Sequence, residues 1–275
     1  MGIKSKLRLV FSNLLAWVIS IICLAPLVLI LFNSLKESVS ASDMNLKVPT
    51  LPLQWSNFSV VIEKGKLLTS FLNSLTYSVG SVILCTFFAA LAAYVFSRNQ
   101  TKWNKILYLY LVLGITMPIN YVALTKVLLV LQLNNTRGGI ILLYTAMQLP
   151  FTVFLCHGFV AKVPVELDEA AIIDGCNAWK LFIYIVFPMM KPAIATAVVL
   201  TFLNTWNEFV SPLYFLSSST KWPMTLSVYN FFGIYFKDWN LVCADIVLTS
   251  APVLLVYLLG QRYIVSGMTA GAVKG

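Results

Sequence analysis

The sequence predicts an all-α, polytopic membrane protein with six transmembrane helices. Of its 275 residues, 59% are hydrophobic and only 11% are charged, whereas about a quarter of the residues in soluble domains are charged. The mean hydropathy is +0.85, and the apolar residues fall in long runs. The net charge of +9 comes from Lys and Arg that lie mostly between these runs. This pattern is typical of the positive-inside bias of membrane proteins, so no nucleic-acid partner is expected.

The first three predicted spans cover residues 14–32, 71–96 and 106–131. The first has 19 residues without a charge, close to the roughly 20 that cross a bilayer core. No A-x-A pattern closes it, which favours a retained span over a signal peptide. Pro118 in the third span leaves two interpretations open, a tolerated kink or a bend that lines a pathway. The basic residues before the first span predict a cytoplasmic N-terminus (Lys4, Lys6, Arg8).

The last three predicted spans cover residues 140–160, 193–216 and 241–259. An even number of spans also places the C-terminus in the cytoplasm, and a single membrane domain over 1–275 is the simplest organisation. The fourth span contains the chain's one histidine, His157. A multi-histidine metal or haem site is therefore excluded by count, and no metal site is expected.

The fifth span carries a polar group whose carboxylate should face a cavity or a partner. A charged side chain within a span costs about 2.5–3.5 kcal/mol on insertion scales. Two roles stay open for the group: lining a substrate pathway, or bracing the helices against a neighbouring subunit. The residues concerned are Asn204, Trp206, Asn207 and Glu208.

Residues 163–192 form a long polar insertion between two spans. Four of the ten acidic residues lie within nine positions (Glu166, Asp168, Glu169, Asp174), at the start of a predicted helix whose dipole favours them. Pro164 fits the first helical turn, and Gly175 fits the left-handed residue that ends a helix. A second helix should begin near Asn177 and stop at Pro188. The insertion is thus either a docking element for a protein outside the bilayer or an interfacial helix pair without a partner.

The same insertion carries a resemblance to a known family. Glu169-Ala170-Ala171 is followed after three residues by Gly175, and after nine more by Ile185 and then Pro188. This order is similar to the cytoplasmic signature of the permease subunits of bacterial ABC importers, with Phe187 where that family usually has leucine. The 204–209 segment and the ending Gly267–Gly275 resemble the carbohydrate-uptake branch. Over essentially its whole length, the chain resembles the smaller six-span permease of maltose-type sugar importers.

The resemblance implies a type I ABC importer permease fold in which the helix after Glu-Ala-Ala is a coupling helix seated on a cytoplasmic ATPase. It implies four kinds of partner: a second homologous permease in a heterodimer, two ATPase subunits, an external solute-binding protein and a sugar. It also implies that the C-terminal tail lies against the ATPase pair. The protein would be located in a bacterial cytoplasmic membrane. The residues implied in ATPase coupling are Glu169, Ala170, Ala171, Asp174, Gly175, Ile185 and Pro188.

The chain itself is not expected to be an enzyme. It has no Gly-x-x-x-x-Gly-Lys-Ser/Thr segment, so ATP and Mg²⁺ should be bound by the partner ATPase and this chain should need no cofactor. No cluster of nucleophile, base and metal ligands is visible. An ion-coupled secondary transporter is the alternative, although that class usually shows repeated halves and more ionisable groups at mid-membrane.

Overall fold

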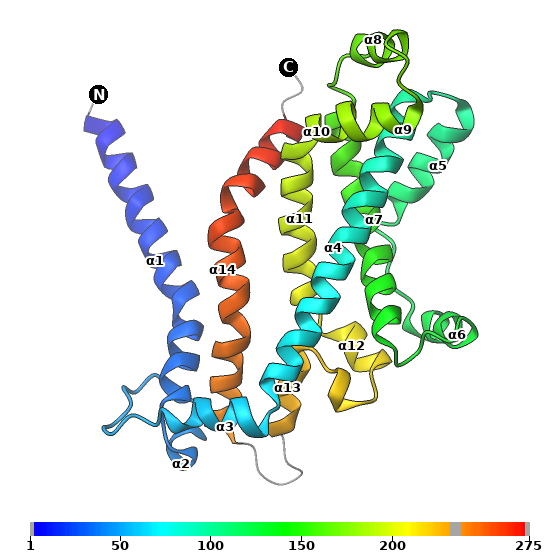
Figure 1. Cartoon of the computed structure of the whole chain (residues 1–275). Coiled ribbons are helices and arrows are strands. Elements are labelled where there is room, and N and C mark those ends of the chain that lie inside the picture. Colours follow the sequence, from blue (N-terminus) through cyan, green and yellow to red (C-terminus); the bar gives the residue numbers. More distant parts are fainter. Residues whose placement is uncertain (1–2, 232–237, 273–275) are drawn as a thin grey trace. The chain divides into compact units, whose positions relative to one another are not determined.

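A computed structural model describes the backbone of residues 3–231 and 238–272 and the side chains of 9–231 and 238–264. Within these ranges the chain is helical, without strands, as the sequence predicts (Figure 1). It divides into two compact units: unit 1 comprises 1–68 and 227–251, and unit 2 comprises 69–226 and 252–275.

Unit 1 contains α1 (Ile3–Ser34), α2 (Ser38–Ala41), α3 (Ser56–Lys64), the 3₁₀ turn Val228–Phe231 and the first part of α14 (Trp239–Ala272). The end of α1 is fixed by a buried polar network. Lys36 Nζ donates to Asn33 Oδ1 at 3.0 Å and to Asn45 Oδ1 at 2.9 Å, and Asn57 Nδ2 donates to the carbonyls of Ser34 and Lys36. Among the described side chains of α1, most from Leu9 to Leu31 are apolar and exposed, as befits a helix facing lipid or a partner.

Unit 2 is built on three long helices, α4 (Leu67–Arg98), α7 (Arg137–Val160) and α11 (Lys191–Trp206), and on the last part of α14. Ser81, Ala89, Ala90 and Ala93 of α4 are fully buried, and a Cβ on Gly80 would lie 3.1 Å from Ile141 of α7. Small residues therefore let α4 pack closely against its neighbours. The shorter elements are α5 (Lys102–Leu113), α6 (Tyr121–Val130), α8 (Glu166–Ile173), α9 (Ala178–Leu181), the π-helix Phe182–Val186, α10 (Phe187–Met189), α12 (Val210–Phe215), the 3₁₀ turn Ser219–Lys221 and α13 (Met224–Ser227).

Four of the six predicted spans are continuous helices: 14–32 in α1, 71–96 in α4, 140–160 in α7 and 241–259 in α14. Among the described residues, four helices are long and apolar enough to cross a membrane. A fifth crossing is possible if the pair Ala178–Met189 and Lys191–Trp206, bent by 76°, counts as one span.

The third and fifth spans differ from the prediction. Residues 106–131 are not one kinked helix: α5 and α6 are separated by residues 114–120, where Pro118 cannot continue a helix and Asn120 caps the next one by accepting from Ala123 N at 3.0 Å. The fifth span begins at Lys191 and stops at Trp206, and α12 follows a break at 207–209. The third and fifth predicted spans are each interrupted in the described residues, and the count of six spans stays a prediction.

Candidate functional site

The polar insertion forms a short helix and a tight turn, as predicted. α8 begins at Glu166, so Pro164 lies just before the helix and not in its first turn. At the other end, Gly175 N donates to Ile172 O at 3.0 Å and Cys176 N donates to Ala171 O at 2.9 Å. These two bonds define a Schellman motif. Gly175 has a φ of +80°, which confirms the predicted left-handed residue.

The second helix of the insertion also begins where the sequence predicts. Asn177 caps α9 by accepting from Lys180 N at 2.9 Å. A turn of π-helix directly precedes Pro188, whose missing N–H interrupts the regular α-helical bonding. The helical path continues to Met189, one residue past the predicted stop, and then bends by 76° into α11.

An apolar cluster holds this segment against the ends of α4 and α7. Ala171 is only 4% exposed and packs there, and Ile185 is partly buried against the same cluster. Ala171, which the resemblance implies in ATPase coupling together with Ala170, has its side chain packed into the bundle in this structure. Ala170 is exposed. The buried members are Ala90, Ala93, Cys156, Val160, Ala171, Leu181, Phe182, Val186 and Met190.

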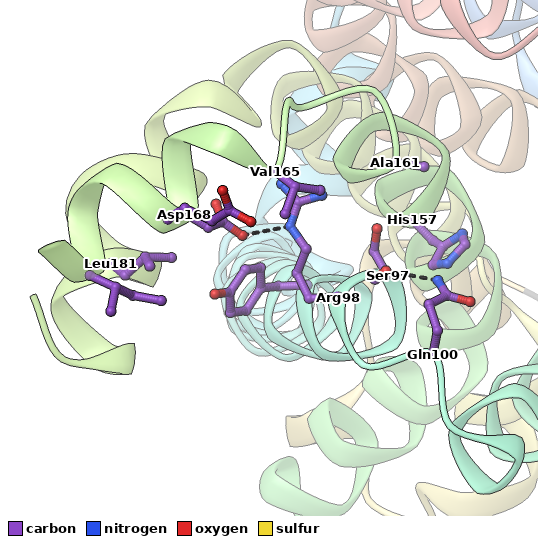
Figure 2. A pocket seen from close by; sticks show the side chains of 11 residues that line it. Ser97, Arg98, Gln100, His157, Ala161, Val165, Asp168 and Leu181 are labelled. Atoms are coloured by element: carbon purple, nitrogen blue, oxygen red, sulfur yellow. Dashed lines mark hydrogen bonds and ion pairs between the residues drawn. The ribbon is translucent and has the colours of Figure 1, made fainter.

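An ion pair that sequence reasoning missed joins α8 to the last residue of α4. Arg98 Nε lies 2.6 Å from Asp168 Oδ2, with side chains 15% and 9% exposed, and Arg98 Nη2 donates to Val163 O at 3.0 Å. Figure 2 shows Arg98 reaching from α4 toward Asp168 on α8. The four clustered acids gave no signal of which one is buried, because the partner lies 70 residues away in the sequence.

A pocket of about 550 Å³ lies beside this ion pair, between α8 and the ends of α4 and α7 (Figure 2). His157 lines it and stacks on Tyr108, with ring centroids 4.3 Å apart. The other lining residues are Tyr94, Ser97, Arg98, Gln100, Ala161, Val165, Asp168, Glu169, Ile172 and Leu181. Beside its contacts with the bundle, α8 therefore borders a cavity.

The outward face of α8 is acidic and apolar. Helical spacing places Glu166, Glu169, Ala170 and Ile173 opposite the buried Asp168 and Ala171. All four are exposed, Ile173 to 86%. Asp174, at the turn, is exposed as well. This face, called the α8 outer face below, has the chemistry to dock a protein surface that offers basic groups and an apolar contact.

The polar group of the fifth span is divided by the structure. Trp206 is 1% exposed and stacks on Phe202 with centroids 5.3 Å apart, so in this structure it is a packing residue and not a sugar-facing one. Asn204 and Asn207 are exposed, and Asn204 Nδ2 donates to Gln148 Oε1 at 3.0 Å. Gln148 was missed. Its polarity within an apolar run was the only signal for it.

Glu208 has a local partner. Its Oε1 accepts from Ser211 N at 2.8 Å, which places the carboxylate at the N-terminal end of α12, where the helix dipole favours it. Glu208 is half-buried. The resembling C-terminal segment Gly267–Gly275 lies outside the residues whose side chains are described.

Comparison with known proteins decides between the classes left open by the sequence. Residues 83–269 match the family of binding-protein-dependent transport system inner membrane components. The chain belongs to this family. It is therefore a multi-pass permease subunit, and the secondary-transporter alternative finds no support in these matches.

The permease is similar along nearly its whole length to several named proteins. It is 34% identical to a putative ABC transporter permease, ORF2, of Caldicellulosiruptor sp. (strain Rt8B.4), covering 99% of both chains. It is 32% identical to the melibiose/raffinose/stachyose import permease MelC of Bacillus subtilis, covering 96% of both. A diacetylchitobiose uptake permease, NgcG, of Streptomyces coelicolor is also 32% identical, covering 95% of this chain and 87% of NgcG.

The fold of the permease is that of a solved ABC importer. A chain of a bacterial ABC transporter involved in alginate import superposes with a TM-score of 0.84, covering 96% of this chain and 98% of that one. The two sequences are 19% identical, so the likeness concerns the fold. A second alginate ABC transporter structure, in complex with an alginate-bound periplasmic protein, superposes with a TM-score of 0.68.

Proposed function

We propose that the permease imports a sugar or an oligosaccharide and forms half of the translocation pathway. Support comes from the relatives, whose names assign them melibiose, raffinose, stachyose and diacetylchitobiose. The other half would be a second homologous permease, and an external binding protein would deliver the sugar. Asn204, Asn207 and Glu208 are the proposed pathway residues, since amides and carboxylates hydrogen-bond sugar hydroxyls and all three keep some exposure.

The α8 outer face is the proposed docking site for a cytoplasmic ATPase, with one ATPase subunit for each permease. The observation that carries this proposal is an exposed acidic and apolar helix face that ends in a tight glycine turn. Glu169 and Ala170 would touch the ATPase, Asp174 would lie at the edge of the contact, and Gly175 would set the angle between α8 and α9. Ile185 and Pro188 would support this surface from behind.

The ATPase would bind ATP and Mg²⁺, and the permease would need no cofactor. Since ATP is cytoplasmic, the end of unit 2 that carries α8 would face the cytoplasm, as would both termini. The three exposed carboxylates Glu166, Glu169 and Asp174 then face a partner that should offer basic side chains at this contact.

Sugar uptake into vesicles tests this function. Vesicles that contain both permeases and the ATPase, supplied with binding protein and internal ATP, should accumulate the sugar. Vesicles without the ATPase should not. Uptake that persists without the ATPase would refute the proposal in favour of a secondary transporter.

A variant pair tests the docking face. Ala170→Arg places a bulky cation on the α8 outer face, so it should abolish binding of the ATPase to the permease in a pull-down and with it ATP-dependent uptake. Ser40→Arg is the control, because Ser40 is also an exposed small residue of a helix but lies on α2, between the first two predicted spans and away from the insertion. Normal ATPase binding by the Ala170 variant would contradict the assignment.

A further inference from the structure

We propose that the Arg98–Asp168 ion pair is the link through which movement of α8 is transmitted to α4. Both are positioning residues, and neither would touch ATP or the sugar. The proposal rests on the proposed function, because it requires that a partner ATPase moves α8. It adds the route by which that movement enters the membrane helices.

The placement of the pair is suited to this task. Arg98 is the last residue of α4, a helix of 32 residues that can move as one rigid element. One guanidinium holds two points of the insertion: Asp168 Oδ2 at 2.6 Å and Val163 O at 3.0 Å. A planar guanidinium that binds two acceptors fixes direction as well as distance, which a lysine ammonium does not.

The surroundings make the pair important for transmission. Ala171 anchors the C-terminal part of α8 in the apolar cluster, whereas a pocket of about 550 Å³ lies beside Asp168, between this side of α8 and the last residues of α4. Across this pocket, Arg98 and Asp168 make a direct, charge-assisted contact between α8 and α4 (Figure 2). Without the contact, α8 would have room to shift toward the pocket while α4 stays in place.

Burial distinguishes Asp168 from the acids around it. Its side chain is 9% exposed, and its Oδ1 has no hydrogen-bond partner among the described residues. The carboxylate is therefore held through Oδ2, and Arg98 supplies the charge that keeps a buried carboxylate tolerable. Glu166, Glu169 and Asp174 are exposed and available to a partner.

The first test separates ATP hydrolysis from transport. In the assembled transporter, Asp168→Asn keeps the shape of the side chain and removes its charge. We expect basal ATP hydrolysis within about twofold of the native complex and at least about a tenfold drop in sugar transported per ATP, as the loss of a charge-assisted contact allows. The exchanged pair Arg98→Asp/Asp168→Arg should recover part of the sugar transported per ATP hydrolysed. Glu63→Gln, which neutralises an exposed acid of α3, should change nothing.

The second test measures the coupling of the two helices directly. Spin labels at Leu167→Cys on α8 and Trp103→Cys at the start of α5 report the distance across the pocket. Both positions are exposed, to 39% and 76%. Cys23 and Cys176 are replaced by serine, because the other three cysteines are buried. In the native background, ATP binding should leave this distance unchanged, and in Asp168→Asn it should alter it.

Three outcomes overturn the proposal. The first is that Asp168→Asn transports as much sugar per ATP as the native complex. The second is that the distance between the labels at positions 167 and 103 responds to ATP equally with and without the Arg98–Asp168 ion pair. The third is loss of the assembled complex in both Asp168→Asn and the exchanged pair, which would assign the pair to folding. If the native complex itself shows no ATP-dependent uptake, the proposed function fails. If it transports and Asp168→Asn transports equally well, only the present inference fails.

Discussion

Gly175 offers the sharpest test of how the turn after α8 works. Its φ of +80° lies in the left-handed region, where a residue with a Cβ is disfavoured by about 1–2 kcal/mol. A Cβ built on Gly175 meets no atom within 4 Å. The cost of Gly175→Ala is therefore backbone strain without a clash. A penalty of that size shifts the local equilibrium away from the native turn by roughly 5- to 30-fold.

The residue type grades the effect. Asn tolerates the left-handed region, so Gly175→Asn should cost less than Gly175→Ala. Gly175→Pro should be the most damaging, because proline fixes φ near −65° and removes the N–H that donates to Ile172 O at 3.0 Å. We expect ATP-dependent uptake to fall in the order Gly, Asn, Ala, Pro. The melting temperature of the purified permease should fall by only a few degrees for Ala, as a strain of about 1–2 kcal/mol allows, and by less for Asn.

A matched control separates this strain from any general effect of adding a methyl group. Gly158, in α7, is also exposed and also has no atom within 4 Å of a built Cβ, but it has no left-handed φ. Gly158→Ala should leave uptake unchanged and gain up to about 1 kcal/mol of helix propensity. Equal uptake by Gly175→Ala, Gly175→Pro and the native chain would show that the turn angle does not matter for coupling.

Three further predictions concern packing. Gly260→Ala should lower the melting temperature of the permease, because the added Cβ would lie 2.7 Å from Val199 Cγ1, at a cost of about 1–3 kcal/mol. Adding Val199→Ala to the same chain should restore most of the lost stability. If the double variant shows no recovery, the predicted contact is wrong. Ala171→Leu should destabilise the permease by a similar amount, because Ala171 is buried. Ala170→Leu should leave the melting temperature unchanged and weaken only ATPase binding. Equal melting temperatures of the two variants would contradict the assignment of Ala171 to the buried side of α8 and Ala170 to the exposed side. Lys36→Met should destabilise unit 1 by about 1–3 kcal/mol, because Asn33 Oδ1 loses its donor, whereas the two Asn45 oxygens that also accept from Lys36 keep Asn33 Nδ2 and Lys47 N as donors. The same change at an exposed lysine serves as control in thermal unfolding.

Local chemistry allowed the turn and the helix starts to be predicted. Gly175 and Asn177 act on their own neighbours within a few residues, through a Schellman motif and an N-cap. Their effects are therefore readable from a single sequence. The predicted start of α8 is too early because a proline, which has no N–H, fits both the first turn of a helix and the position just before it. Pro164 occupies the second of these positions.

The roles that the sequence left open in the fifth span depend on which way a helix is rotated. Trp206 and Asn207 are adjacent, yet one is buried and the other exposed. α11 is apolar on most sides, so its sequence carries little information about rotation. The third span differs from this case. Pro118 and the Asn120 N-cap are local signals of the break between α5 and α6, where the sequence left a kink and a bend open.

The same dependence on tertiary structure gives α8 its two faces. In a helix of eight residues, successive side chains turn by about 100°, so Asp168 and Glu169 must point in different directions. One of them meets Arg98 and the other stays exposed. The docking and anchoring roles therefore fall on adjacent residues, and neutralising each in turn tests both proposals. Asp168→Asn with Glu169 retained should keep ATPase binding and lower the sugar transported per ATP, whereas Glu169→Gln with Asp168 retained should weaken ATPase binding and leave the α8–α4 contact intact.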